Sequence, residues 1–402
     1  MISRQRPLDA AIAAFLWAGG LAVFAVLMTG CDGALPPSRL AVQGLDVPRQ
    51  IDVRDDPFVA VPNGKFVAFI VEDSLKIAHS ILLQSPSPVN VPLAMHELKF
   101  VGVSEHAGPR SRDYLLQLLT DGVFCRSETS HGSSYIIRSA YGKHVVYDSA
   151  DATGNRREAH FGQLVATLAE AAVPSGTTVV DDDGGVGNVS DLVNDLAMRY
   201  SNRAEQEIVA VSLASYLVPG CEWCNANGSD LSVDTVACNL AGKRIGKGAC
   251  AGVHQLYAVA YLLSWDQECK VLRSRTRSLC RNLLKRVSHR LALSQDMSGG
   301  WDGNWWGDGD SERLWPGQSN NSMNSLSATG HHLEWIAIAP PDCCPEPIVV
   351  RRAIEGCVDL LKELRQNTSE GFKVMLPALH AARAIVLLAK ETFSLNESIG
   401  TK

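Results

Sequence analysis

The sequence predicts an all-α protein with the architecture of an α/α toroid, in which helical hairpins form two concentric layers. The first observation is that segments apolar on nearly every side alternate with amphipathic segments after residue 157. A helix that is apolar all round must be buried on all sides, whereas an amphipathic helix covers one face of a core. The second observation is that a histidine recurs near the start of the apolar segments, as in a repeated hairpin.

The composition is that of a globular protein. The chain has 402 residues, of which 46% are hydrophobic and 20% are charged, so it can bury a large core and contains little low-complexity sequence. The formal net charge is -6. Because nucleic-acid binding requires a basic footprint, we expect no nucleic-acid partner.

The first 31 residues have the pattern of a targeting segment rather than of a folded domain. Arg4 and Arg6 precede an uncharged run over 10–30, which is long enough to span a bilayer. The run ends in Met28-Thr29-Gly30-Cys31, which resembles the bacterial lipoprotein box, although Met28 replaces the usual Leu, Val or Ile. Either Cys31 is lipidated, or the segment is an uncleaved anchor helix or an ordinary signal peptide. We expect an exported cell-envelope protein held at a membrane through its N-terminus.

The rest of the chain divides into a tether and one domain. Residues 32–60 are punctuated by proline and aspartate and predict a tether. The toroid domain spans 61–402, and its first part, 61–157, is irregular. Within that part, β-branched and aromatic residues over 134–148 predict a small hairpin.

The helices of the two predicted layers follow from their patterns. The apolar segments of the inner layer are 160–173, 250–263, 326–339 and 376–388. The amphipathic segments of the outer layer are 191–217, 232–241, 270–293 and 348–366. The recurring histidines are His160, His254, His331 and His380. In a toroid, helix starts at the same level would bring these histidines into one central cavity.

One turn within this region resembles a known family. Gln295, Gly299, Gly300 and Trp301 follow a helix and match the repeat of terpene cyclases and prenyltransferase β-subunits, which are α/α toroids. The resemblance covers about residue 159 to the C-terminus and implies the fold. The catalytic motifs are not matched, since Gly248 stands where the prenyltransferases have a zinc-binding aspartate before Cys250. The acidic residues 181–183 resemble a surface turn more than the aspartate-rich motif of cyclases.

The sharpest candidate for chemistry is the start of the segment 326–339. His331 shares a helical face with Glu334 and Trp335, while His332 turns away. A carboxylate fixes the proton position of a neighbouring imidazole and raises its basicity, which suits general acid–base catalysis. His254 and Tyr257 repeat the i, i+3 arrangement. We therefore expect these four residues to be catalytic: His331, Glu334, His254 and Tyr257.

The other candidates are expected to bind a ligand, with a glycan as the favoured class because tryptophan and aspartate cluster in the loops. They are His160, Gln163, Glu222, Trp223, Trp301, Asp302, His332, Trp335, His380 and Arg383. The alternative for each histidine is a hydrogen-bonded core residue, and the tryptophans could simply close their hairpins. Asp302 with Asp308 and Asp310 could also hold calcium.

The cysteines leave several interpretations open. Ten remain besides Cys31, an even number in a compartment that permits disulfides. Most are expected to be structural. The alternatives are a zinc site at Cys221, Cys224, Cys238 and Cys250, or a nucleophilic Cys250 activated by His254. The sequence favours no particular cofactor.

Three functions remain open at this level. The first is an exported, membrane-anchored toroid that binds a polar ligand in a histidine-lined cavity and acts on it by acid–base catalysis, as a lyase, epimerase or hydrolase. The second is a non-catalytic envelope interaction module, and the third is a terpenoid enzyme. Convergence of the four histidines on one water-filled cavity would favour the first, and histidines scattered in dry packing would favour the second. A cavity walled by aromatic residues with a buried acidic pair would favour the third.

Overall fold

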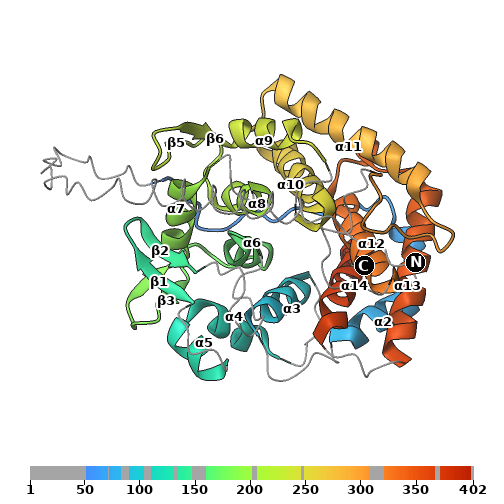
Figure 1. The fold of residues 1–402 in the computed structure, drawn as a ribbon, viewed down its shortest axis with the longest axis horizontal. Helices are drawn as coiled ribbons and strands as arrows, with labels where there is room; N and C mark the ends of the chain where they lie inside the picture. Colours follow the sequence, from blue (N-terminus) through green and yellow to red (C-terminus); the bar gives the residue numbers. More distant parts are fainter. Residues whose placement is uncertain are drawn as a thin grey trace, which may run out of the picture. The chain divides into compact units, whose positions relative to one another are not determined.

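The computed structural model describes residues 51–70, 72–82, 90–103, 110–129, 135–146, 160–201, 206–245, 249–307, 321–366 and 372–399 (Figure 1). These residues are mostly helical, so the predicted all-α class is confirmed. The targeting segment with Cys31 and most of the predicted tether lie outside the described residues. Among the described residues, no helix combines the length and the apolar character needed to cross a membrane.

Six helices pack against one another in a closed order. They are α3 (Val91–Val103), α6 (Gln163–Glu170), α8 (Gln206–Tyr216), α10 (Val253–Cys269), α12 (Asn321–Ile338) and α14 (Phe372–Ile399). Each contacts the next, and α14 contacts α3 again. α6 and α8 are buried along their whole length. For α6 this agrees with the apolar segment predicted over 160–173. The stretch 191–217, predicted as one amphipathic segment of the outer layer, is instead divided, and its second half is the buried helix α8.

A second set of helices packs against these six. It comprises α2 (Glu72–Leu82), α4 (Arg112–Thr120), α5 (Gly122–Glu128), α7 (Val189–Arg199), α9 (Val233–Gly242), α11 (Ser274–Ser294) and α13 (Pro347–Gln366). α2 contacts α14, α4 contacts α3, α7 contacts α8, α11 contacts α10, and α13 contacts α12. On α11 the apolar face predicted from the sequence is buried at Leu283, Val287 and Leu291, whereas Leu279 is exposed. Short 3-10 turns are η1 (Val67–Phe69), η2 (Ala249–Gly252) and η4 (Pro341–Cys343).

The strands form three two-stranded hairpins. The predicted hairpin is β1 (Ile136–Ser139) with β2 (Gly142–Val145), in which Ile136 pairs with Val145. Two further hairpins were not predicted: β3 (Thr178–Val180) with β4 (Val186–Asn188), and β5 (Glu222–Cys224) with β6 (Asp230–Ser232). Strands of three residues are too short to carry a recognisable alternation.

Residues 51–60 belong to the folded domain rather than to a tether. Val53 forms a bridge with Leu217, and the backbone amide of Phe58 donates to Ser215 O over 2.8 Å. The Tyr261 hydroxyl donates to Phe58 O. Because these bonds join the stretch to α8 and α10, the tether predicted over 32–60 ends before Ile51.

The Gln295–Trp301 turn has a structural role. The Trp301 indole is fully buried and its Nε1 donates to Leu291 O over 2.9 Å, while Gln295 Nε2 donates to Val349 O over 2.7 Å. Gly299 has φ 89°, and a Cβ there would lie 2.3 Å from Arg352 O. The motif that resembles the cyclase repeat therefore fastens the end of α11 to α13.

Candidate metal centre

Five histidines from different parts of the chain lie in one row, here called the histidine row. The ring centroids of His160 and His254 are 4.6 Å apart, and those of His254 and His331 are 4.9 Å apart. His331 and His380 follow at 3.7 Å, and His380 and His96 at 4.6 Å. The four histidines predicted to share a site thus lie together. The fifth, His96 on α3, was not predicted.

Glycines bring these rings together, two at helix starts and one inside a helix. The sequence predicted all four histidines near helix starts, but His331 and His380 lie inside α12 and α14. Gly162 and Gly252 are the N-caps of α6 and α10, with φ 82° and 79°, a conformation that glycine adopts without strain. Helices α12 and α14 pack against each other (Figure 1), and Gly330 directly precedes His331 within α12. A Cβ on Gly330 would lie 2.7 Å from the backbone nitrogen of Ala381. The missing side chain therefore lets His331 approach His380.

Cys250 adds a thiol to the histidine row. It has φ 50°, a left-handed conformation that costs a non-glycine residue on the order of 1–3 kcal/mol. Its thiol hydrogen-bonds to His160, His254 and His331. Burial opposes ionisation, but these histidines, His254 first, hold the pKa of the Cys250 thiol well below its usual value. The left-handed backbone thus places the Cys250 sulfur among three imidazoles, which favour its ionised form.

The first group of potential metal ligands is His160, Cys250 and His254. Their ligand atoms all lie within 4.8 Å of one another. The Nδ1 atom of His254 is buried and has no hydrogen-bond partner. Because buried polar atoms are nearly always satisfied, an unpartnered imidazole nitrogen beside a thiolate indicates a missing ligand.

The second group is His331, Glu334 and His380, whose ligand atoms also lie within 4.8 Å of one another. Glu334 Oε2 is 3.3 Å from His331 Nδ1 and 3.1 Å from His380 Nδ1. Glu334 Oε1 accepts a hydrogen bond from Arg383 Nη1 over 2.8 Å. The sequence prediction that His331 and Glu334 share a helical face is therefore confirmed.

The buried charges in this group shift one another's pKa values. Burial opposes ionisation of Glu334, yet His380 and Arg383 hold the pKa of its carboxyl well below the usual range. Burial would lower the pKa of His331, but Cys250 and Glu334 raise it to about 9. Burial and the neighbouring His331 lower the pKa of His380 to about 4. The pKa values of the adjacent imidazoles are thus shifted in opposite directions.

A set of polar side chains flanks the row. The Tyr257 hydroxyl donates to Glu170 Oε1 over 2.6 Å, and Lys99 Nζ lies 2.9 Å from Glu170 Oε2. Arg383 is 3.3 Å from Glu170 and also donates to the Tyr257 hydroxyl over 3.2 Å. Arg383 therefore links the two buried carboxylates, Glu170 and Glu334. Tyr257 and Arg383 were predicted, whereas Glu170 and Lys99 were not.

His332 and the tryptophans form a separate aromatic cluster. The prediction placed Trp335 beside His331, but the Trp335 indole instead donates to His332 Nδ1 over 3.0 Å. The Trp301 and Trp305 rings lie 5.3 and 4.6 Å from the His332 ring. All of these side chains are fully or almost fully buried. None of these tryptophans presents a face to solvent on which a sugar could stack.

The remaining predicted ligand-binding residues are placed differently, since only Gln163 is joined to the histidine row in the described part of the chain, through its backbone amide, which donates to His160 O over 3.0 Å. Gln163 is buried at the start of α6. Glu222 is exposed on β5, and the Trp223 indole donates to Ala197 O over 3.2 Å. Asp302 is exposed and accepts from the amide of Asn304. Asp308 and Asp310, the other two residues of the predicted calcium site, lie outside the described residues.

The cysteines are all free in the described part of the chain, so the structure contains no disulfide among them. Of the four cysteines in the alternative zinc site, Cys250 groups with histidines rather than with Cys221, Cys224 and Cys238. The acidic stretch 181–183 forms the β3–β4 turn, where Asp181 is buried and ion-paired with Lys143.

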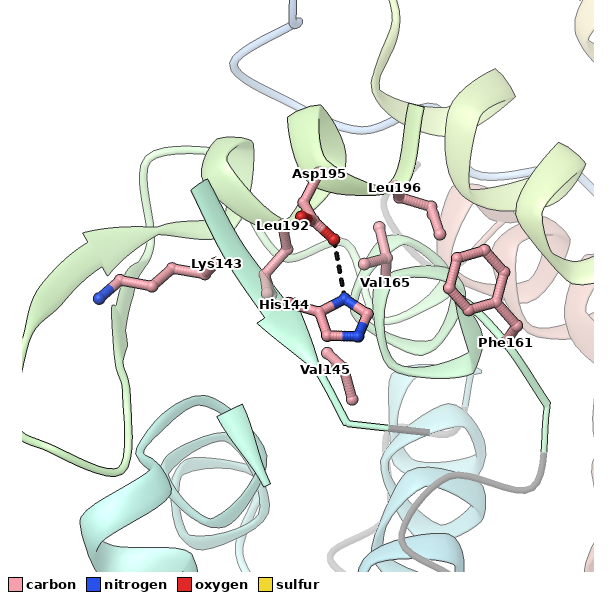
Figure 2. Close-up of a pocket in the computed structure, with 9 residues that line it drawn as sticks. Lys143, His144, Val145, Phe161, Val165, Leu192, Asp195 and Leu196 are labelled. Atoms are coloured by element: carbon pink, nitrogen blue, oxygen red, sulfur yellow. Dashed lines mark hydrogen bonds and ion pairs between the residues drawn. The ribbon is translucent and has the colours of Figure 1, made fainter. Parts of the chain in front are cut away.

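A second histidine–carboxylate pair lies elsewhere, on the β1–β2 hairpin. His144 Nδ1 is 2.8 Å from Asp195 Oδ2 of α7, as Figure 2 shows. The pair borders a small, partly open hollow of about 10 Å³, which is lined also by Phe161, Val165 and Leu196. Asp195 additionally accepts from Ser139 Oγ and from Arg199 Nε.

No protein-family model matches this chain, and no curated protein or solved structure is significantly similar to it.

Proposed function

We propose that this chain is an exported α/α toroid that holds a metal ion at His160, Cys250 and His254 and acts there on a polar ligand. The observation that carries the proposal is the convergence of the histidine row and the Cys250 thiolate. The closed contact order of α3, α6, α8, α10, α12 and α14, with amphipathic helices packed against them, supports the toroid.

The donor set indicates the metal. Two imidazoles and one thiolate suit a borderline-soft ion, and zinc is the common occupant of such sites. Three protein ligands leave one of four tetrahedral positions for water or substrate, as in catalytic zinc sites. The unpartnered Nδ1 of His254 and the strained Cys250 backbone support a bound ion. Zinc here would act as a Lewis acid and lower the pKa of a bound water.

The flanking side chains indicate a polar ligand. Tyr257 and Arg383 offer donors, and Glu170 offers a carboxylate, at the edge of the histidine row. Hydroxyl groups of a glycan, the class predicted from the sequence, can bond to all three. The alternative of a terpenoid enzyme lacks support, since Asp181 is paired with Lys143 and the tryptophans beside His332 are buried.

The test is the metal content of the full-length chain purified in detergent. We expect at least one zinc per chain by elemental analysis, with loss of that zinc in Cys250→Ser and His254→Ala. The matched controls are Cys238→Ser and His289→Ala, which change exposed residues and should retain the metal. A wild-type chain that binds no zinc or other divalent transition metal would overturn the proposal. Mass spectrometry of the mature N-terminus tests lipidation at Cys31.

A further inference from the structure

A chain of hydrogen bonds fixes the proton positions of two histidines in the row. His96 Nδ1 lies 2.7 Å from Pro92 O. A carbonyl oxygen only accepts, so His96 Nδ1 carries the proton and the Nε2 atom of the neutral ring has a lone pair. His380 Nε2 lies 3.0 Å from His96 Nε2. His380 Nε2 must therefore donate to His96.

This assignment leaves a lone pair on the other nitrogen of a neutral His380. That Nδ1 atom faces both oxygens of Glu334, at 3.1 and 3.3 Å. An imidazole lone pair and a carboxylate oxygen are both acceptors, so they repel unless a positive charge lies between them. Either a proton on His380 or a metal ion would meet this requirement.

The distances favour the metal ion. A charge-assisted N–H···O⁻ bond is typically about 2.7–2.9 Å long. By contrast, two ligand atoms that are each about 2.0–2.1 Å from a tetrahedral zinc ion lie roughly 3.3 Å apart. Glu334 Oε2 lies 3.1 Å from His380 Nδ1 and 3.3 Å from His331 Nδ1. Both separations exceed the length of a charge-assisted hydrogen bond, and the second equals the edge of a coordination tetrahedron.

We propose that His331, Glu334 and His380 hold a second divalent metal ion of the zinc class, beside the ion at His160, Cys250 and His254. This inference rests on the proposed function in one respect: it takes the first ion as bound. Cys250 bonds to both His254 and His331, so the two groups are adjacent, as in two-metal sites with ions about 3.5–4 Å apart.

The surroundings of Glu334 suit this role. Arg383 bonds to Oε1, which leaves Oε2 for the ion. His96 supports His380 from behind, in the way that metal-binding histidines bond through their second nitrogen to a partner that fixes their orientation. Both carboxylate oxygens of Glu334 are thus accounted for once the second ion is present.

The experiment is cobalt titration of the full-length chain in detergent, with Co²⁺ as the probe. The thiolate-to-cobalt absorption band reports the first ion, and elemental analysis counts both. We expect two Co²⁺ per wild-type chain, and one per chain, with the thiolate band retained, in Glu334→Gln and His380→Asn. The retained band shows that these variants are folded around the first site.

The matched controls are Glu355→Gln and His289→Asn, at exposed positions on α13 and α11, which should bind two ions. One Co²⁺ per wild-type chain with a thiolate band would overturn the second site and leave the proposed function intact. Two Co²⁺ in both Glu334→Gln and His380→Asn would also overturn it. Absence of any bound Co²⁺ would overturn both proposals.

Discussion

The histidine row and the His144–Asp195 pair both place an imidazole against a buried carboxylate, yet they differ in how their protons are distributed. Asp195 accepts from His144, Ser139 and Arg199, each of which has a proton to donate. Glu334 faces His380 through a nitrogen that has none when the ring is neutral. In the Asp195 cluster every hydrogen bond has both a donor and an acceptor, and the cluster joins the β1–β2 hairpin to α7 (Figure 2). The comparison shows that two clusters of equal proximity can differ in whether every acceptor faces a donor, and the proposed second ion rests on that difference.

The largest expected effect is on zinc affinity at the first proposed site, which contains Cys250. Cys250→Ser replaces a thiolate by a weaker hydroxyl ligand and should weaken zinc binding at the first site by more than about 100-fold, beyond the range typical of supporting residues. Competition with a chromophoric chelator measures it. Asp195→Asn should leave zinc affinity unchanged. A large loss of zinc in Asp195→Asn would remove the distinction between the two regions.

The next effect concerns His96, which we expect to position His380 without contacting the ion. His96→Phe removes the hydrogen bond to His380 Nε2 and should weaken binding of the second ion by about 10- to 100-fold. The first ion should bind normally, as its thiolate–cobalt band would show. His144→Phe is the corresponding change in the other region and should alter neither affinity. Equal effects on both ions would mean that His96 supports the fold in general.

For the stability of the fold we expect the reverse, with the larger effect in the His144–Asp195 region. Asp195 is buried with three donors, and Asp195→Asn should lower the free energy of unfolding by about 2 kcal/mol, less than for a fully buried ion pair because Arg199 is partly exposed. Urea denaturation measures the change. A stability equal to that of the wild type would show that the cluster does not hold the hairpin to α7.

The smallest effect is the pH dependence of that stability. Burial raises the pKa of Asp195, but His144, Ser139 and Arg199 outweigh it and lower the pKa below 3.8 in the folded state. The unfolded state therefore binds the proton more readily, so the stabilisation is full above the unfolded pKa and is lost as pH falls through the folded one. The difference in unfolding free energy between wild type and Asp195→Asn should shrink from pH 5 towards pH 3. A constant difference would assign the effect to packing.

The helix alternation and the phase of His160, His254, His331 and His380 could be predicted because both depend on the 3.6-residue period. The role of His96 could not be predicted, because His96 lies in the stretch 61–157, where the sequence predicts an irregular structure. Glu170 and Lys99 are charged residues at the ends of apolar helices, and only the packing of α6 against α3 gives them each other as partners.

Two other features depend on detail below the level of sequence pattern. Trp335 is four residues after His331 and three after His332, and both spacings bring side chains together on a helix. In the structure, the side-chain rotamers bring the Trp335 indole into contact with His332 and not with His331. The left-handed backbone of Cys250 could not be foreseen either, because such a conformation is rare in residues other than glycine. The sequence linked the thiol to His254 alone, as a possible nucleophile, and predicted no contact with His160 or His331.

The close approach of α12 and α14 at Gly330 gives a recognition pattern for related chains. Any sequence that uses the same centre must keep a glycine directly before the histidine of one helix, because a side chain at that position would meet the backbone at Ala381. It must also keep Cys-x-Gly-x-His, as in Cys250 to His254, where Gly252 caps the helix. Both patterns together form a search query that does not depend on overall sequence similarity.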